Sequence, residues 1–183
     1  MDIFLVRHGE AAASWGESPD PGLSELGRQQ AQIAAEQLRL QLGGGDAQLV
    51  SSPLQRAMET AAPLSTLLQR RVQVDAAFRE IPSPVPLAQR QSWLRQFMQQ
   101  QWHEQVDELQ AWRSTALQQL LGLRQNTAIF THFLVINAVV GQLLERSETL
   151  CFWPANGSIT HLRHSGNDLE LVALGQELQT TVN

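Results

Sequence analysis

A cation and an imidazole come directly after the first apolar segment of the chain. Residues 3–6 are apolar strand formers, and the run stops at Arg7-His8-Gly9. Glycine lets the backbone turn sharply, so both side chains would lie at the carboxyl end of a buried strand, where open α/β sheets bind ligands. An imidazole can attack phosphorus, and a guanidinium fork fits phosphate oxygens. We therefore consider His8 a candidate nucleophile and Arg7 a candidate phosphate ligand, although this tripeptide alone is more often structural.

Two further strand ends supply the other residues that such a site needs. Arg56 lies one turn into the helix expected after Ser51-Ser52-Pro53, and His132 follows the apolar run 127–131. If the three strands are parallel neighbours, two guanidiniums and two imidazoles converge on one edge of the sheet. Each charge-assisted hydrogen bond to an anion there would contribute about 1.5–3 kcal/mol. The helix N-termini after Pro53 and His132 would add N–H donors.

The hydrophobic pattern predicts the elements that would hold these residues. Strands are expected at 3–6, 48–50, 72–74, 127–131, 158–163 and 169–174, and helices at 25–42, 53–68 and 133–144, with two more inside 87–124. Ser24 should cap the first helix, whose core-facing residues are predicted to be Leu26, Ile33, Ala34, Leu38 and Leu42. A turn at 166–168 should join the last two strands.

This order of elements favours a three-layer α/β/α fold with a mostly parallel central sheet. We expect residues 1–183 to form a single domain with a helical insert at about 87–124. The aromatic residues of the insert recur at helical spacing, which is more typical of packing than of a cofactor site.

Composition narrows the possible partners and the compartment. The net charge of −5 argues against nucleic acid and against anionic membranes. We expect no signal peptide, and no apolar run approaches the roughly 20 residues of a membrane span. The single cysteine, Cys151, fits a reducing compartment and is expected to be a buried, inert thiol in a cytoplasmic protein. All 13 basic residues are arginine, which excludes a catalytic lysine.

Several segments, in their order along the chain, resemble the histidine phosphatase superfamily with its phosphoglycerate mutase-like fold. They read LVRHGE, LSELGRQQA, SSPLQRAMETA, FREI, FTHFLVINAVVG and NGSIT, and they cover nearly the whole sequence. The resemblance implies a nucleophile at His8, phosphate-binding residues at Arg7, Arg56 and His132, and a proton donor at Glu80. It implies no metal and no cofactor.

The chain departs from the family pattern at two places. After Glu80 it reads Ile81-Pro82-Ser83-Pro84, where relatives usually carry a glycine and an aromatic-acidic pair. Ala13 and Ser14 occupy the positions at which mutase-like members usually have an aromatic residue and an asparagine. This second departure removes one expected phosphate contact and weakens any argument for a sugar-phosphate substrate.

The function expected from these residues is a metal-independent phosphatase. It would hydrolyse a phosphomonoester or phosphohistidine, on a small molecule or a phosphoprotein, through a phosphohistidine on His8. Three alternatives stay open: mutase-type phosphoryl transfer, which the short lysine-free chain disfavours; a catalytically silent phospho-ligand binder; and a metal site of His8, His132 and Glu80, which nearby arginines would oppose. No oligomeric state is predicted.

Other polar residues have plainer interpretations. The acids of the first loop, at positions 10, 17 and 20, are as compatible with substrate access as with a solvated loop. His103 is expected to be structural, and His161 and His164 to be exposed. Asn156-Gly157-Ser158 is interpreted as a turn before a strand.

Overall fold

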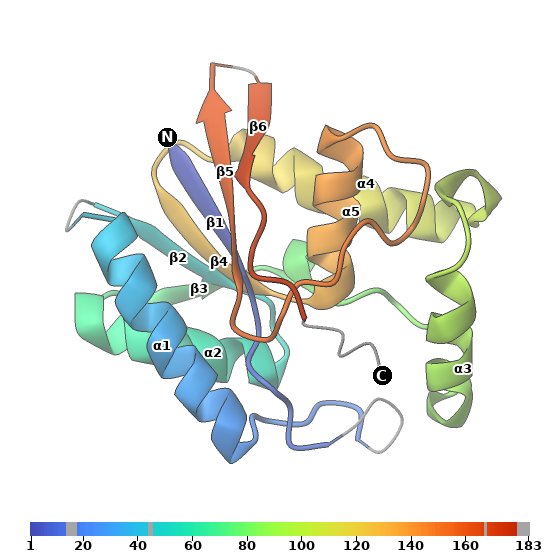
Figure 1. The fold of residues 1–183 in the computed structure, drawn as a ribbon, viewed down its shortest axis with the longest axis horizontal. Helices are drawn as coiled ribbons and strands as arrows, with labels where there is room; N and C mark the ends of the chain where they lie inside the picture. Colours follow the sequence, from blue (N-terminus) through green and yellow to red (C-terminus); the bar gives the residue numbers. More distant parts are fainter. Residues whose placement is uncertain (14–17, 44–45, 167, 179–183) are drawn as a thin grey trace.

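The computed structural model describes residues 1–13, 18–43, 46–166 and 168–178 and contains a six-stranded sheet with helices on both faces (Figure 1). Ser14, Glu17 and Asn167, each part of a sequence-based prediction, lie outside these ranges. The described strands are β1 (Asp2–Arg7), β2 (Gln48–Ser51), β3 (Val72–Val74), β4 (Thr127–Thr131), β5 (Ile159–Ser165) and β6 (Asp168–Ala173). The α-helices are α1 (Glu25–Gln41), α2 (Gln55–Leu68), α3 (Leu87–Phe97), α4 (Asp107–Gly122) and α5 (Phe133–Leu143), and two 3-10 turns, η1 and η2, cover Ala76–Phe78 and Trp102–Glu104.

The sheet has the order β3-β2-β4-β1-β5-β6, and its first four strands are parallel. β5 runs antiparallel to β1, and β6 antiparallel to β5. Successive side chains of β1 point to opposite faces of the sheet. Phe4 packs with α1 and α2 on one face, whereas Leu5 packs with α4 and α5 on the other. The predicted three-layer α/β/α fold with a mostly parallel sheet is confirmed.

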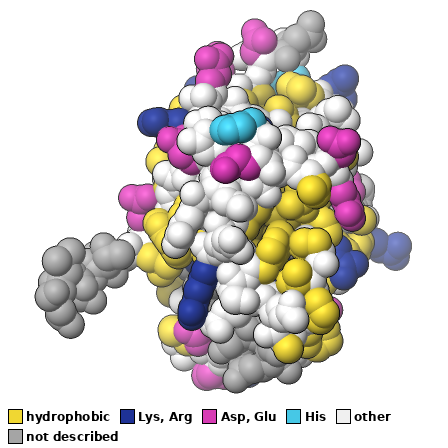
Figure 2. Space-filling model, turned by 90° about the vertical axis from the view of Figure 1, so that its right-hand side faces the viewer, with side chains coloured by type: hydrophobic (Ala, Val, Ile, Leu, Met, Phe, Trp, Pro, Cys, Tyr) yellow, Lys and Arg dark blue, Asp and Glu magenta, His cyan; other side chains and the backbone are white. Residues whose placement is uncertain are grey.

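A third apolar cluster holds α3 and α4 against α5. It includes Ile81, Leu94, Phe97, Trp102, Leu109 and Phe133. Ile81 belongs to the loop after β3, so this cluster also fixes the chain next to Glu80. On the side of the molecule nearest α3, hydrophobic side chains gather in one area with most charged side chains around it (Figure 2). The insert residues thus form the two helices that their periodicity predicts.

The predicted buried face of α1 was partly wrong. Ser24 caps the helix by accepting the N–H of Gly27 at 3.0 Å, as expected. However, Leu26 is 49% exposed and Ile33 60% exposed. The buried side of the helix consists mainly of small residues, Gly27, Ala31, Ala34 and Ala35, with Leu38. Small side chains allow α1 to lie close to the turn that follows His8 and to α2, and this contact turns the larger residues outward.

Four smaller expectations also need correction. α2 begins at Gln55 rather than at Pro53. His164 is buried, with Nε2 3.2 Å from the carbonyl oxygen of Leu121. His161 is partly buried, because its ring stacks on Phe4 and Nε2 lies 2.8 Å from a carboxylate oxygen of Asp2. Cys151 is only partly buried, although burial raises the pKa of its thiol. No described helix is long and apolar enough to cross a membrane.

Candidate active site

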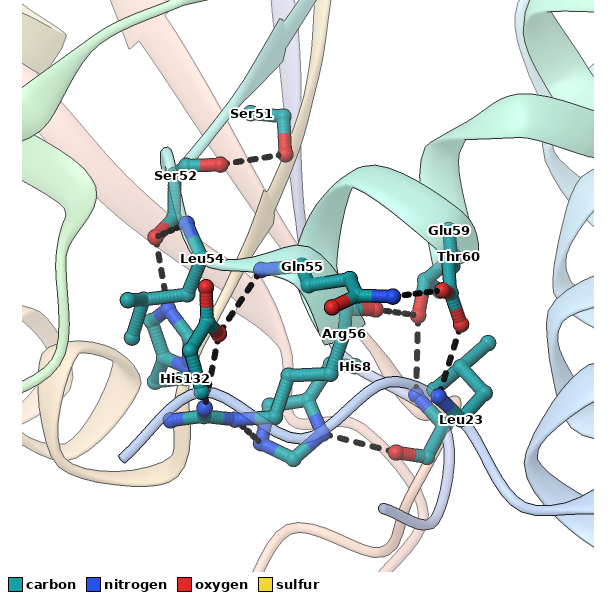
Figure 3. Close-up of polar contacts among 12 residues, drawn as sticks. His8, Leu23, Ser51, Ser52, Leu54, Gln55, Arg56, Glu59, Thr60 and His132 are labelled. Carbon is teal, nitrogen blue, oxygen red and sulfur yellow. Dashed lines mark hydrogen bonds and ion pairs between the residues drawn. The ribbon is translucent and has the colours of Figure 1, made fainter. Parts of the chain in front are cut away.

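The parallel register brings three strand ends together. Arg7 at the end of β1 pairs with Thr131 of β4, and Ser51 of β2 pairs with Phe130 of the same strand. The next residues along each strand, His8, Ser52 and His132, therefore meet at one edge. Arg56 reaches this edge from the first turn of α2 (Figure 3). The predicted convergence of Arg7, His8, Arg56 and His132 is what the structure shows.

His8 is buried, and its hydrogen bonds define one tautomer. Nδ1 donates to the carbonyl oxygen of Gly9 at 2.7 Å, and Arg56 donates from Nε to His8 Nε2 at 3.1 Å. Nε2 therefore carries a lone pair and no proton. Burial lowers the pKa of His8 well below its usual value of 6.5, and the charges of Arg56 and Arg7 lower it further. The imidazole is neutral and has its free nitrogen directed at Arg56.

The turn after His8 is held by contacts that the sequence did not reveal. Gly9 donates its N–H to Thr60 Oγ1 at 3.0 Å, and that hydroxyl donates to the carbonyl oxygen of Arg56 at 2.6 Å. Asn156 donates from Nδ2 to the carbonyl oxygen of His8 at 3.1 Å. Thr60 lies inside the SSPLQRAMETA segment and Asn156 opens NGSIT, so both were in motifs that indicated the family without indicating these roles.

Glycine is needed where this turn meets α1. A Cβ on Gly9 would lie 2.3 Å from the carbonyl oxygen of Gly27, and a Cβ on Gly27 would lie 2.0 Å from that of Glu10. The two backbones are in direct contact there, so no larger residue fits without movement. Glu10 also accepts a hydrogen bond from the hydroxyl of Ser24 at 2.7 Å. The contact with α1 thereby fixes the position of the turn that follows His8.

The two arginines at this edge are anchored differently. Arg7 donates from Nη1 to the carbonyl oxygen of Pro154 at 2.7 Å, and its guanidinium lies 5.0 Å from the centroid of the Phe133 ring. Burial lowers the pKa of Arg7 to about 10, so it stays charged at neutral pH. Arg56 lies 3.7 Å from a carboxylate oxygen of Asp20, which also accepts the N–H of Gln55 at 2.9 Å. One acid of the first loop thus contacts the site.

His132 faces His8 with its ring centroid 5.2 Å away. Its Nε2 lies 2.7 Å from Ser52 Oγ, a hydroxyl that also accepts the N–H of Leu54 at 3.2 Å. Nδ1 of His132 is buried and has no hydrogen-bond partner among the described residues. Burial lowers the pKa of His132 well below 6.5, and the nearby charges of Arg56, Arg90 and Arg7 act in the same direction. A dianionic ligand would offset that effect and offer Nδ1 an acceptor.

Glu80 is a buried carboxyl group whose charge interacts with Arg56. One of its oxygens accepts the N–H of Ile81 at 3.1 Å. Burial raises the pKa of Glu80 above its ordinary 4.5, although Arg56 opposes the shift. A carboxyl group with a raised pKa is suited to donate a proton near neutral pH. Glu80, the predicted proton donor, thus lies near enough to Arg7 and Arg56, the predicted phosphate ligands, for their charges to interact.

A cavity of about 280 Å³ is formed at Arg7 and His8. Its other lining residues are Glu10, Ala11, Ala13, Gln91 and Asn156. Within the described part of the chain, no three His, Cys, Asp or Glu side chains are grouped closely enough to hold a metal ion. The alternative metal site of His8, His132 and Glu80 is therefore not formed. Beside the Glu10 carboxylate, the lining of this cavity includes the cation Arg7 and the amide donors of Gln91 and Asn156, which are groups that can bind phosphoryl oxygens.

The fold is phosphoglycerate mutase-like, and two arginines and two histidines gather at the carboxyl ends of its parallel strands. A mycobacterial glucosyl-3-phosphoglycerate phosphatase has the same fold, with a TM-score of 0.74 and 24% identity over 97% of this chain and 99% of that one. The phosphoserine phosphatase of Entamoeba histolytica gives 0.74 and 24%, covering 96% of both chains. YhfR of Bacillus stearothermophilus gives 0.78 and 20%, covering 97% of this chain and 98% of that one.

The family follows from the sequence match. Residues 3–177 match the family model of the histidine phosphatase superfamily (branch 1), and the chain belongs to this superfamily, as its motifs predicted. The predicted class, a phosphoric monoester hydrolase, agrees with that family. A bifunctional protein of Mycobacterium tuberculosis is 40% identical over 77 residues, which are 40% of this chain and 21% of that protein. The match thus covers about a fifth of that relative's length.

Proposed function

We propose that this protein is a metal-independent phosphatase that uses His8 as its nucleophile. The observation that carries the proposal is the tautomer of His8: the hydrogen bond from Nδ1 to Gly9 leaves Nε2 unprotonated beside Arg56. A neutral imidazole held in this way can attack phosphorus without prior loss of a proton. Arg7 and Arg56, both anchored at the same strand edge, supply the positive charge that a metal ion would otherwise provide.

The reaction follows in two steps. Nε2 of His8 forms a bond to phosphorus while the ester P–O bond breaks, and Glu80 gives its proton to the departing oxygen. Glu80, now a carboxylate, takes a proton from water, whose oxygen bonds to phosphorus as the Nε2–P bond breaks. Arg7, Arg56 and His132 bind the equatorial oxygens and stabilise the charge that develops on them.

We propose a phosphorylated small molecule as the substrate. Two of the solved relatives are named for action on glucosyl-3-phosphoglycerate and on phosphoserine, both of this kind. A cytoplasmic location and the lack of nucleic-acid or membrane partners remain predictions from composition. Phosphoprotein substrates also remain predictions.

The test combines turnover with detection of the intermediate. We expect wild type to hydrolyse para-nitrophenyl phosphate in the presence of EDTA, and His8→Ala to lose this activity. Intact-mass spectrometry after denaturation at neutral pH should show a phosphoryl adduct on wild type and none on His8→Ala. His103→Ala is the matched control because His103 is exposed and lies in η2, outside the site. Turnover that survives in His8→Ala would refute the proposed nucleophile.

A further inference from the structure

Arg90 is a cation of the helical insert that the catalytic scheme leaves unused. It lies in α3 and is half-buried, and its Nη2 is 3.4 Å from the carbonyl oxygen of Ile81. Its Nε is buried and has no hydrogen-bond partner among the described residues. A guanidinium N–H without an acceptor in such a place is costly unless a ligand completes it.

This guanidinium lines a second cavity, which has a volume of about 400 Å³. Its walls include Leu54, Arg79, Glu80, Ser83, Arg90 and Trp112. Glu80 is the acidic residue of that lining, and the cavity otherwise presents two arginines, a hydroxyl and apolar side chains. Since the proposed proton donor must touch the departing oxygen, the rest of the leaving group has to lie beside Glu80, and this cavity provides space for it.

The balance of charge around Glu80 favours an anion in this cavity. Arg56 lies near two other cations, Arg79 and Arg90. Repulsion from their charges lowers the pKa of Arg56. Asp20 pairs with Arg56 at 3.7 Å, but within the described ranges neither Arg79 nor Arg90 has a carboxylate within ion-pair distance. The phosphoryl group of a substrate would be bound by Arg7 and Arg56. Two arginines would still lack an anionic partner.

We propose that Arg90, assisted by Arg79, binds an oxyanion group carried by the leaving group of the substrate. The preferred substrates are then phosphomonoesters of small organic acids, with a carboxylate or a second phosphate a few bonds from the ester oxygen. Apolar contacts with Leu54 and Trp112 would surround the short carbon chain between the two anionic groups. This assignment of substrate class rests on the proposed function, since it takes Glu80 to mark the leaving-group side.

Matched substrates isolate the second anionic group. The phosphate monoester of β-hydroxypropionate and propyl phosphate share a three-carbon chain and differ by the carboxylate. We expect wild type to prefer the first in kcat/KM by about tenfold or more, the gain of one charge-assisted hydrogen bond. Arg90→Gln should remove most of that preference. Arg95→Gln, which makes the same change of charge at an exposed position of α3, should keep it.

A binding measurement separates this inference from the catalytic proposal. Calorimetric titration of phosphonobutyrate and butylphosphonate, which cannot be hydrolysed at the P–C bond, should show the same preference in wild type and its loss in Arg90→Gln. Preference in binding without any turnover would support the anion site while refuting the phosphatase. Turnover with equal kcat/KM for both esters, or a preference that Arg90→Gln retains, would overturn the assignment of Arg90. Circular dichroism and a urea unfolding curve establish that each variant is folded.

Discussion

Arg56 donates a hydrogen bond from Nε to Nε2 of His8 at 3.1 Å, so the proposed phosphate ligand occupies the lone pair of the proposed nucleophile. The same lone pair must point at phosphorus for attack. Arg56 therefore has to exchange His8 for a phosphoryl oxygen when the substrate binds. Arg56 makes one charge-assisted hydrogen bond before the exchange and one after it. The acceptor of that bond changes from His8 to the substrate.

Removal of the Arg56 guanidinium should impair the chemical step. We expect Arg56→Gln to lower kcat by about 10²–10³, the usual cost of losing one donor to developing charge, and to raise KM. Steady-state kinetics with para-nitrophenyl phosphate measure both. Arg39→Gln is the matched control, since Arg39 is an exposed arginine of α1 paired with Glu36. An Arg56→Gln enzyme as active as wild type would contradict the role given to Arg56.

Glu80→Gln should allow transfer of the phosphoryl group to His8 but slow the hydrolysis of the phosphohistidine. Glutamine cannot accept a proton from water, so the phosphoryl group should stay on His8, whereas para-nitrophenolate leaves with little help from an acid. We expect a burst of product equal to the enzyme present, then turnover about 10²–10⁴ times slower than wild type. Rapid-quench kinetics and intact-mass spectrometry would follow burst and adduct. Glu108→Gln, at an exposed position of α4, serves as control.

The pH profile provides a separate check on Glu80. Burial raises the pKa of Glu80, so the carboxyl group holds its proton above pH 4.5 and loses it as pH rises through the raised pKa. With an alkyl phosphate, whose oxygen needs that proton, kcat/KM of wild type should fall along this basic limb. Glu80→Gln should lack the limb. A limb that persists in Glu80→Gln would assign the proton to another group.

The predicted strands and the meeting of their ends, which the structure shows, depend on features of neighbouring residues in the sequence. A strand that ends in Arg7-His8-Gly9 and a strand that ends in His132 are local features, and parallel pairing brings their ends together in any sheet of this kind. The predictions that failed depend on contacts between distant segments. Helical hydrophobicity alone predicts that Leu26 and Ile33 lie in the core, whereas the close approach of Gly27 to Glu10 selects the small-residue side of α1 as the buried one.

The contacts of Asn156 were missed for a related reason. The residue lies 148 positions after His8, and β5 brings it there by pairing antiparallel with β1. A turn before a strand was all that its neighbours indicated. The sequence is equally compatible with Asp20 as a solvated acid and as a site residue, since only the folded loop shows that it contacts both Arg56 and the first N–H of α2.

The buried imidazole of His8 should make the protein less stable in acid. Its pKa is lowered well below 6.5, so as pH falls the unfolded chain takes up a proton there that the folded protein does not. Stability therefore falls as pH drops below 6.5. From pH 6 to 5, we expect wild type to lose about 1 kcal/mol relative to His8→Asn, measured by urea unfolding. Glu80, whose raised pKa favours the folded protein as pH falls, is present in both proteins. Its contribution to the free energy of unfolding therefore cancels when wild type is compared with His8→Asn. His103→Asn should behave as wild type, and equal slopes for wild type and His8→Asn would contradict the expectation.

The contact between α1 and the turn that follows His8 can be tested with a single methyl group. In Gly27→Ala the new Cβ would lie 2.0 Å from the carbonyl oxygen of Glu10, so the helix or the turn has to move. We expect a loss of about 1–3 kcal/mol in the free energy of unfolding, together with a fall in kcat because the backbone that carries His8 shifts. Gly122→Ala is the control: nothing lies within 4 Å of its added Cβ, and alanine in place of glycine in a helix should leave stability equal or higher. If Gly27→Ala matched wild type in both unfolding and kcat, the turn would be held by Thr60 and Asn156 alone, and α1 would have no part in positioning His8.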